Sequence, residues 1–318
     1  MPKNVLILAG GGGHTGYGYA LAQRLYGRAN LYFLVPEGDV LSQKRLSKFG
    51  CVDFLLKARG AKTSTYEFVP KLAMAFVNSF TRVSRAYDVV VSTGSNFCIP
   101  PAFFAWMKGI PLVNIESPVR FTKPSKSARL LHPFSTITAM HWEEQKRLLK
   151  GGVVVGPILP KPTIETRNNG YILVAGGTLG HRLLFDALAM SNLRNVVLQT
   201  GKLDPEPYAS KHPEWKIVTL TERFHELLAG AEVIVTHFGV TVLEAILYGK
   251  PVVLVPNPEW TRTAGVEDAK CLARKVNAVL VSEIKTETLL DAINEARTRE
   301  IPRLPDGAER LANIILEL

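Results

Sequence analysis

Short apolar runs alternate with longer stretches of helical periodicity along the whole chain. In the first half we expect strands over residues 5–8, 31–35, 52–56, 89–92, 112–115 and 136–139. In the second half we expect them over residues 171–175, 195–199, 215–218, 233–236, 252–255 and 278–281. Brief apolar strands separated by helices are typical of a mostly parallel sheet that is covered on both faces. The pattern therefore predicts an α/β protein built from doubly wound, Rossmann-like sheets.

One segment interrupts this alternation and predicts a domain boundary. Residues 156–170 read GPILPKPTIETRNNG, with three prolines, an Asn pair and little apolar periodicity. We expect an N-terminal domain over residues 1–156, a linker over 157–169 and a C-terminal domain over 170–318, with the last helix free to pack back on the first domain. The halves also echo each other, since ILAGGGGHTG resembles ILVAGGTLGH. Two such domains facing each other across a cleft suit a reaction between two substrates.

Composition narrows the class of protein. The chain has 318 residues, 47% of them hydrophobic and 21% charged, which describes a globular protein. We expect it in the cytoplasm, because it lacks a long uncharged apolar window and a secretory signal. Residues 1–156 hold 20 Lys and Arg against 8 Asp and Glu, whereas residues 157–318 hold 18 against 20. The basic half indicates an anionic partner such as a phosphate, a nucleic acid or an anionic membrane surface.

The first expected strand runs into a glycine loop that carries a histidine. Gly10 to Gly13 allow a tight turn and a close approach to a ligand, and His14 lies where a helix over about 15–24 begins. A helix N-terminus disfavours a nearby cation, so the imidazole should stay neutral and be able to take a proton from an alcohol. The same loop also fits the dinucleotide pattern GxGxxG through Gly11, Gly13 and Gly16. Two acidic residues, Glu37 and Asp39, follow about 20 positions on, as that pattern requires.

A carboxylate follows another expected strand of the first half. In VNIESPVRF, Glu116 comes directly after the apolar run, and Ser117 and Pro118 end it. A lone carboxylate at a strand end is often a cap or an ion-pair partner. Together with Arg120 in a cleft, Glu116 would bind a sugar hydroxyl or assist His14.

Two segments of the second half are suited to a nucleotide. The loop GGTLGHR presents backbone amides at a helix N-terminus, a site for a diphosphate, with His181 and Arg182 adding positive charge. In VIVTHFGVTVLEAILYGKP, a turn leads into a helix whose Glu244 can accept hydrogen bonds from both hydroxyls of a ribose. The candidate residues of these loops are Gly176, Gly177, Thr178, Gly180, His237, Gly239 and Thr241.

Two segments of the basic half are rich in aromatic residues and methionine. They are YEFVPKLAMAFVNSF (66–80) and FCIPPAFFAWMKGIP (97–111). Helices that combine apolar and basic residues can lie on a membrane surface. The basic residues within or beside them are Lys62, Lys71, Arg82, Arg85 and Lys108. Ordinary core helices would show the same pattern, and the basic excess of this half favours the membrane.

The motifs together resemble a known family. The first 150 residues resemble the membrane-associated subunit of the eukaryotic UDP-GlcNAc transferase of the dolichol pathway, through GGGGHTG, STGSNFCIPPAF, NIESPVRF, LLHPF and HWEE. The second half resembles the donor-binding subunit of that enzyme and the bacterial lipid II-forming GlcNAc transferase, through GGTLG, HFGVTVLEAILYGKPVVLVPNP and VEDAKCLA. The chain looks like a single-chain fusion of the two eukaryotic subunits.

The resemblance implies a GT-B fold and an inverting transfer that uses no metal and no cofactor. The implied reaction moves GlcNAc from UDP-GlcNAc to a polyprenyl- or dolichyl-diphosphate-GlcNAc on the cytoplasmic face of the membrane. It implies His14 as general base, Glu116 beside it, and acceptor or phosphate contacts from Gly12, Gly13, Thr15, Ser95, Asn96 and Arg120. The implied donor contacts are the glycine loop, Phe224 near the uracil, Glu244 on the ribose and Glu267 on the sugar.

Two positions depart from the family pattern, and other functions are compatible with the sequence. Pro118 stands where the family more often has an aromatic residue, and Gly265 replaces a Gln that helps to read the donor sugar, which leaves the transferred sugar open. The alternatives are a UDP-GlcNAc 2-epimerase-like enzyme, another lipid-linked UDP-sugar transferase, a dinucleotide-dependent oxidoreductase and a non-catalytic sensor. No nucleic-acid partner is expected, and a homodimer is left open.

Overall fold

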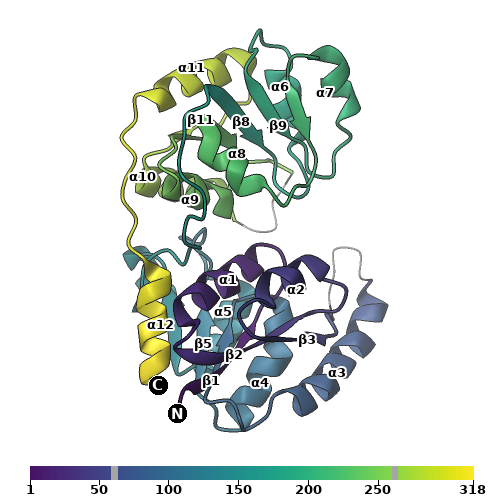
Figure 1. Cartoon of the computed structure of the whole chain (residues 1–318), viewed down its shortest axis with the longest axis vertical. Coiled ribbons are helices and arrows are strands. Elements are labelled where there is room, and N and C mark those ends of the chain that lie inside the picture. Colours follow the sequence, from purple (N-terminus) through teal and green to yellow (C-terminus); the bar gives the residue numbers. More distant parts are fainter. Residues whose placement is uncertain (59–63, 260–263) are drawn as a thin grey trace. The chain divides into compact units, whose positions relative to one another are not determined.

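The computed structural model describes residues 1–58, 64–259 and 264–318 (Figure 1). The chain divides into two compact units. Met1–Lys161 and Pro305–Leu318 form unit 1, and Pro162–Leu304 forms unit 2. Residues 157–161 and the last helix therefore belong to unit 1. Lys62, one of the basic residues singled out above, lies outside the described residues.

Unit 1 is built on a parallel sheet of seven strands in the order β3-β2-β1-β4-β5-β6-β7. The strands are β1 (Lys3–Leu8), β2 (Ala29–Pro36), β3 (Cys51–Leu55), β4 (Val89–Ser92), β5 (Leu112–Ile115), β6 (Ile137–Met140) and β7 (Val153–Val154). The helices are α1 (Gly13–Leu25), α2 (Val40–Leu46), α3 (Thr65–Arg82), η1 (Asn96–Cys98), α4 (Ile99–Met107), α5 (Lys126–Leu131), η2 (His132–Phe134), η3 (Glu143–Arg147) and α12 (Gly307–Glu317).

Unit 2 repeats this plan with a parallel sheet of six strands in the order β10-β9-β8-β11-β12-β13. The strands are β8 (Tyr171–Ala175), β9 (Val196–Gln199), β10 (Lys216–Val218), β11 (Ala231–Thr236), β12 (Val252–Leu254) and β13 (Val279–Leu280). The helices are α6 (Arg182–Leu188), α7 (Glu206–Lys211), α8 (Phe224–Gly230), α9 (Val240–Leu247), α10 (Val266–Val276) and α11 (Thr286–Arg297).

Both sheets have the strand order of a Rossmann fold. In each, the first strand is central, the chain builds outward on one side through the second and third strands, and it returns to the other side with the fourth. The order reverses between β1 and β4 in unit 1 and between β8 and β11 in unit 2. Open α/β sheets bind ligands at such switch points, beyond the carboxyl ends of the strands.

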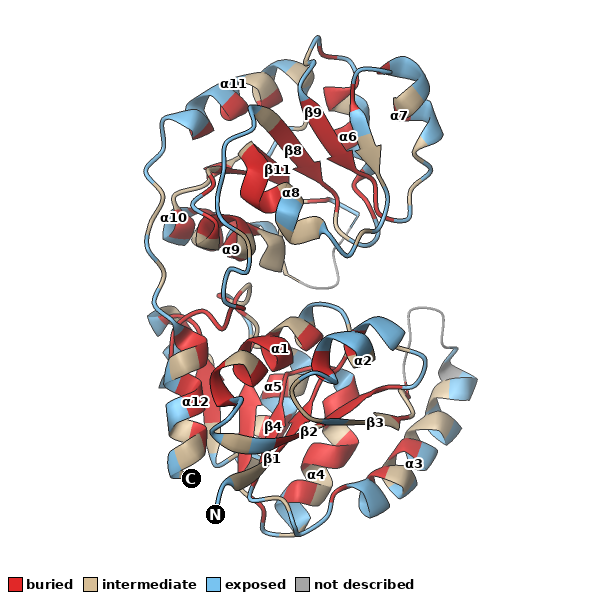
Figure 2. Cartoon of the chain, viewed as in Figure 1, coloured by how far each residue is buried: buried red, intermediate tan, exposed pale blue. Residues whose placement is uncertain are grey.

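The central strands are mostly apolar because both faces of each sheet are covered. In unit 1, Leu6 and Leu8 contribute to a core cluster on one face, and their neighbours Val5 and Ile7 are fully buried as well. Successive side chains of a strand point to opposite faces, so burial of both sets requires a layer on each side. Figure 2 shows the central strands buried along most of their length in both units.

The predicted fold class is confirmed: the chain contains two Rossmann-like parallel α/β sheets. Each of the twelve expected strands is present to within two residues at its ends. The sequence did not predict β7, because two residues at a sheet edge show no periodicity. Helix α1 begins at Gly13 rather than near Thr15, so His14 lies in its first turn.

Helix α12, from the C-terminal part of the chain, packs against α1 and belongs to unit 1. Arg24 of α1 is buried and contacts the N-cap Asp306 at 3.0 Å, and Arg28 contacts Glu309 at 2.9 Å. These contacts anchor the helix whose first turn carries His14.

Candidate active site

The loops that follow β1, β4 and β5 pack against one another with almost no space between them. A Cβ atom at Gly10 would lie 1.9 Å from Oγ of Ser95. Gly94 has a φ of +89°, and a Cβ atom there would lie 2.5 Å from the carbonyl oxygen of Ile115. Only glycine fits these two positions, and their close packing brings the loop before α1 onto the loop after β4.

This packing orients the imidazole of His14. Its Nδ1 lies 2.7 Å from the carbonyl oxygen of Thr93. A carbonyl oxygen only accepts hydrogen bonds, so Nδ1 must donate and carry the proton. The neutral ring then has its lone pair on Nε2, the nitrogen that can accept a proton. The side chain is partly exposed at the carboxyl edge of the sheet.

The surroundings of His14 favour its neutral form. Burial lowers the pKa of His14 below its usual value, the Thr93 carbonyl opposes that shift, and the charge of Lys57 lowers the pKa further. A base must be deprotonated to act. His14 is therefore in its basic form at neutral pH.

A second histidine, which the sequence analysis did not single out by itself, lies behind His14. Tyr17 packs edge-on to the ring of His14, with 6.1 Å between ring centroids, and contacts the ring of His141 at 5.8 Å. Nε2 of His141 donates to the carbonyl of Glu116 at 2.8 Å, and its Nδ1 accepts from the amide of Ile158 at 3.3 Å. Burial lowers the pKa of His141 to about 4, so it is a neutral structural group.

Glu116 is fully buried, and its carboxylate closes the loop 116–125. The amide of Ser117 donates to Oε1 at 2.6 Å, and the amide of Ser125 donates to Oε2 at 2.9 Å. Burial raises the pKa of Glu116, while these hydrogen bonds and the nearby Arg120 oppose the shift. Both carboxylate oxygens accept from loop amides, and the Thr93 carbonyl holds Nδ1 of His14, so assistance of His14 by Glu116 stays a prediction.

The motifs NIESPVRF and HWEE, far apart in sequence, form one unit. Gln145 accepts from the amides of residues 141 and 142 and donates to the carbonyls of Ser117 and Arg120. The indole of Trp142 donates to the carbonyl of Pro118 at 2.8 Å. The loop 116–121 is thereby held rigidly at the carboxyl end of β5.

The other predicted acceptor contacts lie on or under the same loops. Gly12 is the exposed N-cap residue of α1, Gly13 opens that helix, and Asn96 is exposed at the start of η1. Ser95 and Thr15 are buried: Ser95 accepts from the amide of Phe97, and Thr15 shares a hydrogen bond with Ser42. Arg120 is half-buried in the loop 116–125. Asp39, one of the two acidic residues of the dinucleotide reading, instead caps α2.

The predicted donor loops of unit 2 meet at its own switch point. Gly177, which follows β8, has a φ of +66°, and a Cβ atom there would lie 2.4 Å from Cε1 of His237, which follows β11. Gly176 and Gly180 are equally crowded, and Thr178 is exposed at the tip of the loop. The contact juxtaposes the loop 176–180 with the N-terminus of α9.

Two buried histidines lie beneath these loops. Burial lowers the pKa of both His181 and His237 to about 4, and the nearby His181 lowers the pKa of His237 further. His181 is the N-cap of α6, where Nδ1 accepts from the amide of Leu184. The expectation that His181 adds positive charge is corrected, because a fully buried imidazole with this pKa is neutral at pH 7.

The remaining donor candidates are arranged around the carboxyl edge of the sheet of unit 2. Gly239 is the N-cap of α9, Thr241 lies in its first turn, and Glu244 is half-buried one turn further on. Phe224 is the first residue of α8. Glu267 is exposed in the first turn of α10 and pairs with Lys270 at 2.7 Å.

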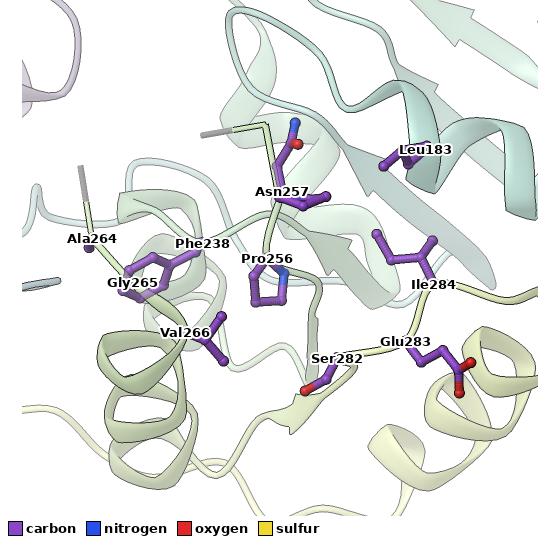
Figure 3. A pocket seen from close by; sticks show the side chains of 11 residues that line it. Leu183, Phe238, Pro256, Asn257, Ala264, Gly265, Val266, Ser282, Glu283 and Ile284 are labelled. Carbon is purple, nitrogen blue, oxygen red and sulfur yellow. The ribbon is translucent and has the colours of Figure 1, made fainter. Parts of the chain in front are cut away.

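A pocket of about 520 Å³ opens beside these residues within unit 2 (Figure 3). Its walls are the ends of β11, β12 and β13 and the first residues of α6 and α10. Figure 3 shows Phe238 and Gly265 on one side, and Ile284 and Leu183 on the other. The complete described lining is Leu183, Phe238, Pro256, Asn257, Pro258, Ala264, Gly265, Val266, Ser282, Glu283 and Ile284. The pocket adjoins the predicted donor loops and includes Gly265, the departure noted above.

Comparison with known proteins places this architecture. MurG of Acinetobacter baumannii has a similar structure, with a TM-score of 0.68, 17% identity and complete coverage of both chains. UDP-GlcNAc 2-epimerase of Neisseria meningitidis has a TM-score of 0.69 at 15% identity, covering 99% of this chain and 98% of that one. Two Rossmann-like units of this kind make up the GT-B architecture.

The two halves match two different family models. Residues 5–158 match the model described as oligosaccharide biosynthesis protein Alg14 like, and residues 171–308 match the glycosyltransferase family 28 C-terminal domain. The chain thus joins an Alg14-like segment to a glycosyltransferase family 28 C-terminal domain. The suspected resemblance is confirmed, and the protein is a glycosyltransferase. A relative named UDP-N-acetylglucosamine–N-acetylmuramyl-(pentapeptide) pyrophosphoryl-undecaprenol N-acetylglucosamine transferase, from Salinibacter ruber, is 26% identical over 99% of this chain and 96% of its own.

Proposed function

We propose that this glycosyltransferase moves GlcNAc from UDP-GlcNAc to a polyprenyl- or dolichyl-diphosphate-GlcNAc, forming a chitobiosyl lipid and UDP. The observation that carries the proposal is the orientation of His14, whose Nδ1 is held by the Thr93 carbonyl so that Nε2 is the basic nitrogen. The Alg14-like match of the segment that contains His14 supports an acceptor of lipid-linked oligosaccharide synthesis.

The chemistry requires a base and a stabilised leaving group. The acceptor hydroxyl oxygen forms a bond to the anomeric carbon, the bond from that carbon to the UDP oxygen breaks, and the hydroxyl proton passes to Nε2 of His14. Attack opposite the leaving group inverts the anomeric centre. A positioned base of this kind contributes about a hundred- to ten-thousand-fold to the rate.

The family 28 segment supports placing the donor in unit 2. The amides of residues 176–180 and of the α9 N-terminus are suited to the diphosphate, since such amides stabilise charge that develops on a leaving group. We propose that Glu244 accepts hydrogen bonds from the ribose hydroxyls and that the region 220–224, with Phe224, receives the uracil. We assign Glu267 to the sugar hydroxyls. We also propose that the reaction needs no metal.

A second acceptor has its own support. The full-length relatives bear the name of the transferase that acts on N-acetylmuramyl-(pentapeptide) pyrophosphoryl-undecaprenol. The same base and donor site would serve that acceptor, so the two candidates differ in the acceptor that brings the hydroxyl, GlcNAc in one and N-acetylmuramyl-pentapeptide in the other. An epimerase-like activity has support from the fold alone.

We further propose that unit 1 docks on the cytoplasmic face of a membrane through α3 and α4. None of the helices in the described ranges is long and apolar enough to span a membrane. Helix α3 instead exposes Tyr66, Val69, Met74, Val77 and Phe80, and α4 adds Trp106 and Met107. An apolar face of this extent, with basic residues beside it, suits an interfacial position.

The basic residues around this face divide into two groups. Lys108 donates to the carbonyls of Phe80 and Val83 at the end of α3, and Arg82 pairs with Asp53. These two stabilise unit 1 locally. Lys71 is half-exposed but pairs with Glu67 at 2.8 Å, so the exposed Arg85 is the residue of this set that supplies charge for anionic lipid.

The docking face predicts the effect of one surface substitution. Val77→Glu replaces an exposed apolar side chain by a charge, so we expect at least a fivefold loss of binding to vesicles that contain anionic lipid. Sedimentation with vesicles at low and high salt measures it. Met190→Glu, a matched change at an exposed position of unit 2, should leave binding unchanged. Equal losses in both variants would contradict the assignment.

One assay separates the candidate functions. The protein is incubated with labelled UDP-GlcNAc and one of three additions: a synthetic GlcNAc-diphosphate lipid, an N-acetylmuramyl-pentapeptide-diphosphate lipid, or none. The proposal predicts UDP release and labelled disaccharide lipid with the first acceptor. Label only in the second product would favour the peptidoglycan-type reaction. Free N-acetylmannosamine without lipid would overturn the transferase proposal in favour of an epimerase.

A further inference from the structure

A lysine that no motif contains lies over the glycine loop of unit 1. Lys57 follows β3, and its Nζ donates to the carbonyl oxygen of Gly10 at 3.2 Å. A Cβ atom at Gly11 would lie 3.6 Å from this Nζ. The ammonium therefore sits against the two glycines that directly precede the N-cap of α1.

A carboxylate beside the same glycine already has hydrogen-bond partners. Oδ2 of Asp39 lies 3.2 Å from the same built Cβ position of Gly11. Asp39 accepts from the amide of Ser42 at 3.1 Å and from its hydroxyl at 2.7 Å, and Ser42 continues the network to Thr15 of α1. Lys57 forms no ion pair with any residue of the described ranges.

The position of Lys57 suits an anion at the glycine loop. Its hydrogen-bond partner is a neutral carbonyl, and the Asp39 carboxylate beside the same glycine is already bound by Ser42, so the ammonium keeps donors for a further anion. An ammonium has three donors, and a phosphate offers several strong acceptors. The exposed N-cap Gly12 lies two residues from Gly10, where the amides of the first turn of α1 begin.

We propose that Lys57 is a positioning residue for the acceptor: its ammonium binds the diphosphate of the lipid-linked sugar over the glycine loop, beside His14. The inference rests on the proposed function, because it assigns the acceptor diphosphate to this loop. It concerns the acceptor only, and it assigns Lys57 no part in donor binding.

The positive charge of Lys57 also keeps His14 deprotonated when an anion binds nearby. A diphosphate near His14 raises the pKa of the imidazole, because negative charge stabilises the protonated ring. Lys57 acts in the opposite direction, as it lowers the pKa of His14. The other groups that face this region are Tyr17 on α1, the Thr93 carbonyl after β4, and Asp39 beside Gly11.

The test compares Lys57→Met with Lys57→Arg and with Lys48→Met. Lys48 belongs to the same unit and the same charge class, but it contacts Tyr19 and Phe49 on the outer surface. Loss of a charge-assisted hydrogen bond should raise the acceptor KM of Lys57→Met about 10- to 100-fold, with the donor KM unchanged. Lys57→Arg should recover most of the loss, and Lys48→Met should resemble the unaltered protein.

The acidic limb of the pH profile gives a second readout. Without the charge of Lys57 the pKa of His14 rises, so the acidic limb of kcat/KM for the acceptor should move to higher pH in Lys57→Met. A merely structural lysine would lower kcat without moving that limb. An unchanged acceptor KM in Lys57→Met, or an equal rise in the donor KM, would overturn the proposal.

Two measurements do not depend on turnover. An NMR titration of the His14 ring should show a higher pKa in Lys57→Met than in the unaltered protein, and binding of inorganic pyrophosphate should weaken in Lys57→Met but not in Lys48→Met. If the unaltered protein fails to use any lipid-linked acceptor, the proposed function fails. If pyrophosphate binding and the pKa of His14 are also the same in Lys57→Met as in the unaltered protein, this inference fails separately.

Discussion

Replacing His14 by alanine should lower kcat about a hundred- to ten-thousand-fold while the KM for UDP-GlcNAc stays within about twofold. The proposed role of His14 is to remove the acceptor proton as the new glycosidic bond forms. Without Nε2 the hydroxyl must lose its proton to water. The donor is assigned to unit 2, so its binding should not depend on this side chain. Steady-state kinetics with the GlcNAc-diphosphate lipid measures both constants.

A second substitution separates the loss of the base from a loss of structure. In His14→Asn the side-chain amide can still donate to the Thr93 carbonyl, as Nδ1 does at 2.7 Å, but it provides no basic nitrogen. We expect this variant to be as stable as the unaltered protein and as inactive as His14→Ala. His132→Asn is the matched control, because both ring nitrogens of His132 bind within unit 1. A His14→Asn variant that kept more than a tenth of kcat would refute the base assignment.

Gly94→Ala should cost about 2–4 kcal/mol of unfolding free energy and lower kcat at least tenfold. The new Cβ atom would lie 2.5 Å from the carbonyl oxygen of Ile115, and the backbone at Gly94 has a φ of +89°. Relief of the clash must move the loop that carries the Thr93 carbonyl, which positions His14. Displacing a catalytic group by about 1 Å can reduce a rate by about a hundredfold. Chemical denaturation and steady-state kinetics measure the two effects.

Gly109→Ala is the matched control for this loop. Gly109 has a φ of +71°, so alanine is strained there as well, but nothing lies within 4 Å of the added Cβ atom. We expect a cost of about 1–2 kcal/mol from the backbone alone and an unchanged kcat. If the two variants lost the same stability and both kept full activity, close packing of the loops would not be what positions His14.

The fold could be predicted from the sequence because burial on both faces leaves a direct trace in the residues. A parallel strand that is covered on each side must be largely apolar, and runs such as VLIL (5–8) and ILVA (172–175) show this without any need to know the neighbours. The glycine loop before His14 was equally visible, because a tight turn at the end of such a strand requires glycine.

The candidate site was predicted only in part, because loop proximity depends on strand order. The motifs GGGGHTG and STGSN are about 80 residues apart, and they meet because β1 and β4 are neighbours in the sheet. The roles of Glu116 and His181 could not be read from residue type. Each role depends on whether the side chain is exposed to a ligand or buried among backbone donors.

The sequence by itself determined two Rossmann-like domains, the glycine loops and His14 as the candidate base, because apolar periodicity and turn chemistry are local properties of the chain. The tertiary structure decided which nitrogen of His14 is basic, that Glu116 ties a loop, that His141 is neutral, and that Lys57 lies over Gly10. Those properties depend on groups that meet only after the chain has folded, since burial and hydrogen-bond partners set the charge and the direction of a side chain.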